Sequence, residues 1–156
     1  QVQSHSKYSC QHKEEPVIDF KSKLGRKAMR HLKKEYFVWL TTVDSTGTPQ
    51  PRPVWFVLEG DSLLLYSQPG AFKLKHIINR PNVSLHFNTP DPKGEKDVIV
   101  ISGTAKIDPK SQPANKNNIY MRKYRQGIKG LDATPQKFAE EYSTAIRIKI
   151  TSLRGW

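Results

Sequence analysis

The stretch that decides the fold runs from residue 36 to residue 67 and reads YFVWLTTVDSTGTPQPRPVWFVLEGDSLLLYS. Aromatic and β-branched residues dominate three runs in it, at 36–43, 49–59 and 62–67. Such runs favour strands, and the turn-forming residues Asp44-Ser45-Thr46-Gly47 and Gly60-Asp61 separate them. The stretch therefore predicts a three-stranded antiparallel meander with short connections.

Outward from this stretch, the remaining chain alternates further strands with a few helices. Strand patterns recur at 82–89, 97–108 and 145–153, with Gly103 as an expected bend or bulge. Helical patterns are found at 19–34, 71–80, 111–126 and 135–142. Asp19 or Ser22 is the expected cap of the first helix, and Thr134 that of the last. The pattern predicts a mainly β protein, a six-stranded antiparallel barrel with peripheral helices.

Length, charge and cysteine content limit the classes of protein to consider. The chain has 156 residues, enough for one domain over 19–156 after a polar, flexible tail at 1–18. The single cysteine, Cys10, excludes a cysteine-rich zinc site, so no metal site and a cytoplasmic location are expected. No apolar run reaches the length of a membrane span. The net charge of +12 favours an anionic ligand or partner.

The run Pro49-Gln50-Pro51-Arg52-Pro53-Val54-Trp55-Phe56 is the first of two segments that point to a binding site. Its three prolines stand at alternate positions, so the three missing backbone donors would all have pointed to one side of the strand. Such a strand pairs with one neighbour only. Its free side is either a protected sheet edge or a surface that meets a ligand.

The second segment, Tyr66 to His76, predicts a strand, a Gln68-Pro69-Gly70 turn and a helix with Lys73 in its first turn. Free N–H groups at a helix start, the Ser67 hydroxyl and an ammonium group together favour a phosphate. The segment therefore predicts an anion site. Elsewhere, His76 is expected on the exposed side of its helix. The familiar catalytic motifs are absent, so a bound cofactor is expected to supply the chemistry.

Together the two segments resemble the pyridoxamine-phosphate-oxidase-type split barrel, the superfamily of flavin and deazaflavin oxidoreductases. The resemblance rests on Arg52-Pro53-Val54, on Tyr66-Ser67 and on Lys73, six residues after the serine, and extends to Arg80-Pro81-Asn82-Val83-Ser84-Leu85. The stretches WLTTV, PVWF, SQP and EEYS are similar to the branch that binds the deazaflavin F420. This likeness covers most of 36–154.

The resemblance implies a homodimer of split barrels with cofactor sites at the interface. Lys73 and Ser67 would bind the cofactor phosphate, Arg52 would lie near the phosphate or the ring, and Pro53, Val54, Trp55 and Phe56 would present backbone atoms to the ring. The remaining residues of the expected cofactor-binding set are Tyr66, Gln68, Phe72 and Asp97. Asp97 stands where the phosphate oxidases have a glutamine. The ending Arg154-Gly155-Trp156 lacks the oxidase pattern that reads the vitamin substrate, which argues against oxidation of a vitamin phosphate.

The expected cofactor is F420, with FMN as the alternative. F420 carries a phosphodiester and an acidic oligoglutamate tail, which the basic helices at 19–34 and 71–80 would attract. The expected activity is hydride transfer between the deazaflavin and an electron-poor small molecule such as an enone or quinone. No catalytic side chain is assigned, and Tyr66 and Tyr120 are the candidate proton donors. The competing interpretations are an FMN-dependent oxidoreductase and a non-catalytic flavin- or haem-binding protein; binding of nucleic acid is not expected.

Overall fold

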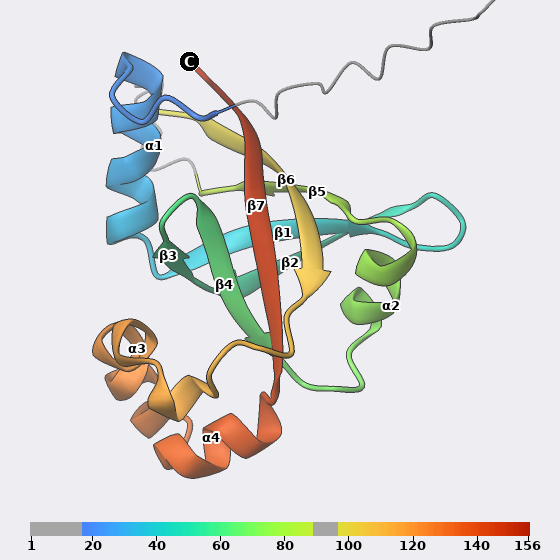
Figure 1. Cartoon of the computed structure of the whole chain (residues 1–156), viewed down its shortest axis with the longest axis vertical. Coiled ribbons are helices and arrows are strands. Elements are labelled where there is room, and N and C mark those ends of the chain that lie inside the picture. The colour runs from blue at the N-terminus through green and yellow to red at the C-terminus, as the bar shows by residue number, and fades with distance from the viewer. Residues whose placement is uncertain (1–16, 89–96) are drawn as a thin grey trace, which may run out of the picture.

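The fold is a curled antiparallel sheet with helices on its outside (Figure 1). The computed structural model describes residues 17–88 and 97–156, so most of the expected tail and part of the 82–89 strand lie outside the described residues. Seven strands form one sheet in the order β2-β1-β5-β6-β7-β4-β3. They are β1 (Phe37–Val43), β2 (Pro49–Trp55), β3 (Val57–Glu59), β4 (Ser62–Ser67), β5 (Asn82–His86), β6 (Ile99–Ile107) and β7 (Thr144–Gly155). The split-barrel class expected from the sequence is confirmed.

Four α-helices and one short 3₁₀ turn surround the sheet. They are α1 (Lys23–Lys34), α2 (Phe72–Asn79), η1 (Ala114–Lys116), α3 (Asn118–Gly130) and α4 (Pro135–Glu141). The Ser22 side chain caps α1 and the Thr134 side chain caps α4, as their sequences predict. In Figure 1, α3 and α4 lie together at one end of the sheet, and α2 lies beside β6. No helix in the described parts of the chain is long and apolar enough to cross a membrane.

The expected six strands are seven, because the predicted strand at 49–59 is broken at Phe56. Its first part, β2, forms one edge of the sheet and pairs only with β1, while its second part, β3, forms the opposite edge and pairs with β4. Both antiparallel pairings of the predicted meander are present, β1 with β2 and β3 with β4, but the middle strand is not continuous, so the three strands do not lie side by side. A chain that passes from one edge of a sheet to the other requires the sheet to curl until its edges approach.

Phe56, at the break, is fully buried, and its backbone groups are bonded to α3 rather than to a strand. The Tyr124 hydroxyl accepts a hydrogen bond from the Phe56 N–H at 2.8 Å and lies 2.7 Å from the Phe56 carbonyl oxygen. The Lys123 ammonium group donates to the same carbonyl at 3.0 Å. An unpaired buried backbone group is costly, so these contacts are what allow the strand to break here.

Two hydrophobic clusters share β4 between them. One fills the curled sheet and includes Leu63 and Leu65; the other lies under α3 and α4 and includes Leu64 and Tyr66. Successive side chains of a strand point to opposite faces, so β4 is buried on both. The second cluster positions the aromatic side chains of the candidate site.

Gly103 lies at a β-bulge, as its sequence position predicts. The pairing of β6 with β7 shifts register between Ser102 and Gly103. A Cβ at Gly103 would lie 2.6 Å from the Ile148 Cγ2 atom and 2.8 Å from the Lys149 carbonyl oxygen. The close approach of β7 therefore excludes a side chain at this position.

Candidate functional site

The turn after β4 brings the start of α2 against β2. Ala71, the N-cap of α2, makes no side-chain capping hydrogen bond, so no side chain occupies the first N–H groups of the helix. Lys73 lies in this first turn and is half-buried. Burial, and secondarily the positive charge of Arg52, lower the pKa of Lys73 from its ordinary value. Two cations thus lie near each other beside an uncapped helix start.

Neither cation has an acidic partner among the described residues. The salt bridges in that part of the chain involve Lys27, His31 and Arg147, and none involves Arg52 or Lys73. Burying a positive charge without a counter-charge is unfavourable, and an anionic ligand removes the cost. The start of α2 is therefore suited to a phosphate.

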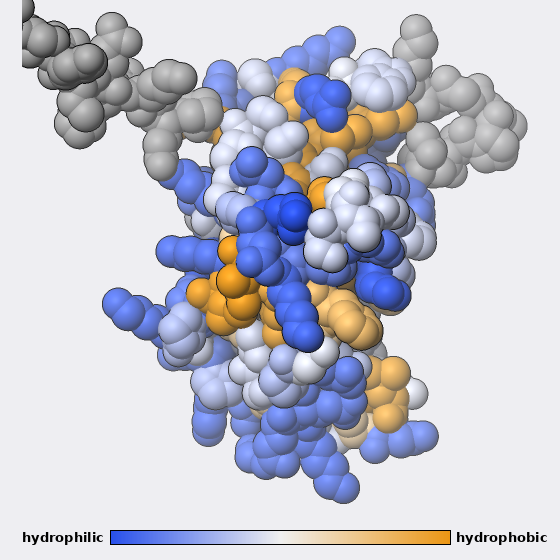
Figure 2. Space-filling view, turned by 90° about the vertical axis from the view of Figure 1, so that its right-hand side faces the viewer, coloured by the Kyte–Doolittle hydropathy of each residue, from blue (hydrophilic) through white to orange (hydrophobic). Residues whose placement is uncertain are grey.

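A hollow of about 480 Å³, the basic groove, lies between α2 and the β1–β2 turn. Basic side chains line it: Arg52, Lys75, His76 and Arg80. The exposed ring of Phe72 also lies in its wall. Figure 2 views the side of the molecule that carries α2, where hydrophilic side chains surround smaller apolar patches. The groove has the charge and polarity expected of a site for an acidic chain.

Asp44 is the acidic side chain that lines the basic groove, and its carboxylate is already occupied. It accepts hydrogen bonds from the Thr46 hydroxyl, the Gln50 amide and the backbone N–H groups of Thr46 and Thr48. These bonds, that from the Thr46 hydroxyl first, hold the pKa of Asp44 far below its usual range. Asp44 therefore fixes the β1–β2 turn and leaves the cations of the groove without a bonded carboxylate.

A second hollow of about 340 Å³, the aromatic cavity, begins at Lys73. Its strand wall consists of Phe37, Pro53, Val54, Trp55 and Tyr66, and its helical wall of Tyr120, Leu131, Phe138 and Tyr142. The Trp55 ring stacks on Tyr124 at a centroid distance of 4.7 Å and on Phe138 at 5.7 Å. A Cβ at Gly127 would lie 2.9 Å from the Trp55 ring, so only glycine lets α3 approach it. These contacts hold the strand wall rigidly.

The structure brings most of the expected cofactor residues to these two hollows. Pro53, Val54, Trp55, Tyr66 and Lys73 line the aromatic cavity, and Arg52 and Phe72 line the basic groove. Phe56 and Ser67 are buried and line neither hollow; the Ser67 hydroxyl donates to the Gln68 carbonyl oxygen at 3.0 Å. The exposed Gln68 amide donates to Glu141.

Asp97 lies apart from both hollows, against α1. Its carboxylate is 3.0 Å from His31 and 3.3 Å from Lys27. Burial alone would raise the pKa of Asp97, but the hydrogen bond from His31 and the nearby Lys27 outweigh it, so the pKa is lowered. His31 also approaches Glu35 at 3.4 Å and stacks on Phe87. Through these contacts Asp97 anchors α1 to the sheet.

His76 corrects one expectation and the helical wall adds a feature that the sequence analysis missed. His76 is half-buried rather than exposed, and its Nδ1 atom lies 2.8 Å from the Thr42 hydroxyl. Of the helical wall, Tyr120 alone was a candidate residue. Leu131, Phe138 and Tyr142 belong to ordinary helical patterns, so no local motif distinguishes them as part of a site.

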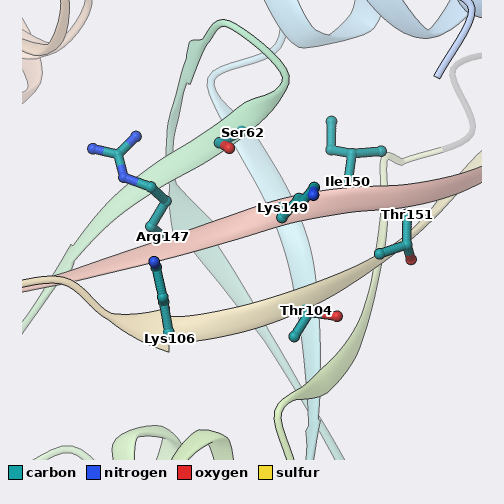
Figure 3. A pocket seen from close by; sticks show the side chains of 7 residues that line it. All are labelled: Ser62, Thr104, Lys106, Arg147, Lys149, Ile150 and Thr151. Atoms are coloured by element: carbon teal, nitrogen blue, oxygen red, sulfur yellow. The ribbon is translucent and has the colours of Figure 1, made fainter. Parts of the chain in front are cut away.

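A third hollow, of about 320 Å³, lies on the outer face of β4, β6 and β7 and contains none of the expected residues (Figure 3). Alternate residues of β6 and β7 line it, among them Lys106, Arg147 and Lys149. Arg147 is paired with Glu59 at 3.1 Å and with Asp108 at 2.8 Å, so its charge is balanced. No aromatic side chain lines this hollow, which makes it a poor site for a conjugated ring.

Comparison with known proteins identifies the family. The sequence pattern of the family described as pyridoxamine 5'-phosphate oxidase matches residues 24–156. The chain belongs to this family. No curated protein matches the chain.

Solved structures similar to this family member have different described roles. A putative pyridoxamine 5'-phosphate oxidase from Listeria innocua has 20% identity and a TM-score of 0.62, over 83% of this chain and 95% of its own. A protein described as an F420 reductase has 20% identity and a TM-score of 0.58, over 80% and 94%. A haem storage protein from Vibrio cholerae has 11% identity and a TM-score of 0.56, over 86% and 95%. At these identities the likeness shows the shared fold alone.

Proposed function

We propose that this protein binds the deazaflavin F420 in preference to FMN and reduces an electron-poor small molecule such as an enone or quinone. The observation that carries the proposal is the pair Arg52 and Lys73, two cations without a bonded acid at the junction of an aromatic cavity and a basic groove. A cofactor with a conjugated ring, a phosphate and an acidic tail fits the aromatic cavity, the two cations and the basic groove, in that order. FMN has no tail to fill the groove.

Each part of the site then has a role in holding the cofactor. Lys73 and the uncapped start of α2 bind the phosphate, Arg52 adds a second positive charge, and Pro53, Val54 and Trp55 lie against the ring. Lys75 and Arg80 attract the tail. When bound in its reduced form the deazaflavin supplies a hydride, and a proton from water completes reduction of the double bond.

The lining of the aromatic cavity argues against haem, the ligand in the name of one structural neighbour. Haem iron takes a histidine, cysteine, methionine or tyrosine ligand. No histidine, cysteine or methionine is among the described residues that line the cavity, which leaves only its tyrosines as haem ligands. We therefore keep haem as an outcome of the experiment and not as a second proposal.

Titration of the purified protein with F420, FMN and haem tests the proposal. We expect F420 to bind most tightly, with an affinity that rises with the number of glutamates in its tail and falls with added salt, because salt screens charges over ~10 Å at 0.1 M. The ligand absorbance spectrum and the melting temperature are the readouts. Tight FMN or haem binding beside negligible F420 binding would overturn the proposal.

We also propose that the protein is a symmetric dimer that covers both hollows. The β2 edge is unpaired among the described strands, and two apolar side chains near it are exposed, Phe37 at 50% and Phe72 at 71%. Exposed apolar groups beside a sheet edge favour association. Sedimentation at micromolar concentration should give a dimer, and a clean monomer with F420 present would exclude an interface site.

A further inference from the structure

The helical wall of the aromatic cavity is not accounted for by the expected cofactor residues. Tyr120, Leu131, Phe138 and Tyr142 come from α3, α4 and the residues that end these helices. The residues that the cofactor needs lie on β2, on β4 and at the start of α2. The accessible surface of the helical wall, which comes mainly from Leu131 and the partly exposed Tyr142, is therefore open to a second ligand placed beside the cofactor ring.

Tyr120 is the buried polar feature of this wall, whereas the other hydroxyl on it belongs to the partly exposed Tyr142. The Tyr120 side chain is 1% exposed, and its hydroxyl makes no hydrogen bond to any residue in 17–88 or 97–156. Yet this hydroxyl is not sealed within the protein. A fully enclosed hydroxyl without a partner would belong with the enclosed polar atoms that make no hydrogen bond. Among the described residues Asp97 Oδ1 is the only such atom, so the Tyr120 hydroxyl keeps some accessibility. The remaining accessibility of Tyr120 thus places its hydroxyl against the cavity that it lines.

The neighbouring tyrosines differ from Tyr120 in this respect. The Tyr66 hydroxyl donates to the Gln112 carbonyl oxygen at 2.7 Å, and the Tyr124 hydroxyl is bonded to Phe56. Both rings contact the Tyr120 ring, at centroid distances of 4.8 and 4.7 Å. In a packed group of three tyrosines, one hydroxyl alone is left for a ligand. A buried donor without an acceptor is unfavourable, and a ligand oxygen would remove that cost.

The rest of the wall defines the kind of ligand. Leu131, Phe138 and Tyr142 carry no charge. Phe138 already stacks on Trp55 and on Tyr142, so the partly exposed Tyr142 ring is the aromatic surface that this wall presents to a ligand. Flat apolar surfaces favour a planar conjugated molecule, and an ionised group placed among them would lose its hydration without a counter-charge. Lys73 is the cation lining the cavity, and the proposed function assigns it to the cofactor phosphate.

We infer that the helical wall binds a neutral, planar conjugated ketone or quinone and that Tyr120 donates a hydrogen bond to its carbonyl oxygen. This rests on the proposed function, in which the ketone or quinone is the hydride acceptor. Burial, followed by the neighbouring Tyr124, raises the pKa of Tyr120 above its ordinary value, so its hydroxyl stays a donor throughout the neutral range. Tyr120 is then a residue that determines specificity for carbonyl compounds.

The experiment uses fluorenone, a neutral planar ketone with a single carbonyl group, and the full chain without cofactor. Calorimetry gives the affinity, and the carbonyl stretching frequency in the infrared reports the hydrogen bond. Tyr120→Phe should weaken fluorenone binding about 3- to 10-fold and should raise the frequency toward its value in an apolar solvent. The matched control is Tyr36→Phe, which removes a hydroxyl that already donates to the Lys123 carbonyl oxygen and that does not line the cavity. It should leave the affinity within about twofold and the frequency unchanged.

The outcomes separate this inference from the proposed function. Equal affinities for the wild type and Tyr120→Phe, or an equal loss in both variants, would overturn the inference whatever the cofactor. The titration is then repeated with saturating F420. Fluorenone that still binds supports the assignment of the helical wall to a second ligand, and competition would give the wall to the cofactor ring. Failure of F420 to bind would overturn the proposed function and leave the first result standing.

Discussion

The basic groove and the aromatic cavity meet at two pairs of consecutive residues, yet they are built in different ways. Arg52 lines the groove and Pro53 the cavity, and the same holds for Phe72 and Lys73. The lysine and arginine side chains of the groove are exposed, and α2, which carries Lys75, is held by its buried residues Leu74 and Ile77. The cavity side chains Tyr120 and Phe138 are members of the second hydrophobic cluster. In the basic groove, the side chains that line the hollow are not those that hold the fold. In the aromatic cavity, some of the lining side chains also belong to the hydrophobic core.

The largest expected effect of this difference is on stability, at the cavity. Phe138 is 3% exposed and stacks on Trp55 and Tyr142. Phe138→Ala should lower the free energy of unfolding by about 3–5 kcal/mol, because it removes a buried ring and leaves a void. Urea denaturation measures it. Leu131→Ala at the 57% exposed rim of the same cavity is the control and should cost under about 1 kcal/mol. Equal losses would mean that the cavity is not part of the core.

The next effect is on ligand binding, at the junction of the two hollows. Lys73→Ala should weaken binding of both F420 and FMN by roughly 10- to 100-fold, since a charge-assisted hydrogen bond to phosphate contributes about 1.5–3 kcal/mol. The melting temperature of the free protein should change little, because removing a half-buried cation without an acid partner also removes its desolvation cost. Wild-type affinity in this variant would place the phosphate elsewhere.

A smaller effect, selective for the tail, is expected in the groove. Lys75 and Arg80 line it and are exposed. Each alanine substitution should weaken binding of long-tailed F420 about 2- to 5-fold and leave FMN affinity unchanged, since exposed charge pairs contribute about 0.2–1 kcal/mol. Competition with F420 of defined tail length measures this. An equal loss for FMN would show that the groove and the phosphate site act as one.

The smallest effect concerns pH and the Phe56 break. Burial lowers the pKa of Lys123 to about 8, so between pH 8 and the ordinary lysine value of 10.5 the unfolded chain binds more protons than the folded one. The contribution of Lys123 to stability should therefore rise through this range, by under about 1 kcal/mol because the group is half exposed to solvent. Lys123→Met should remove the rise. Unfolding curves at pH 8 and pH 9.5 for both proteins provide the test, and parallel changes would contradict it.

Local patterns predicted the helix caps, the bulge at Gly103 and the free edge at 49–55, because each depends on the conformational limits of one or two residues. They missed the break at Phe56, since the polar groups that satisfy its backbone come from Lys123 and Tyr124, far along the chain. The site divides in the same way. The strand, turn and helix start that carry Lys73 form a local motif that the sequence predicts, and their phosphate-binding role stays a prediction. The helical wall instead depends on how α3 and α4 pack against β3 and β4.

The Tyr124 contacts at Phe56 also bear on the order of folding. Strands β2 and β3 can reach their opposite edges only once the sheet has curled, and the groups that satisfy the break between them, the Tyr124 hydroxyl and the Lys123 ammonium group, lie 68 and 67 residues away. Closing so long a loop is entropically costly and is delayed until other contacts offset it. The Phe56 amide should therefore be among the last to gain protection from hydrogen exchange, after the pairing of β6 with β7. A chain emerging from the ribosome would hold an open, apolar seam until α3 had been synthesised.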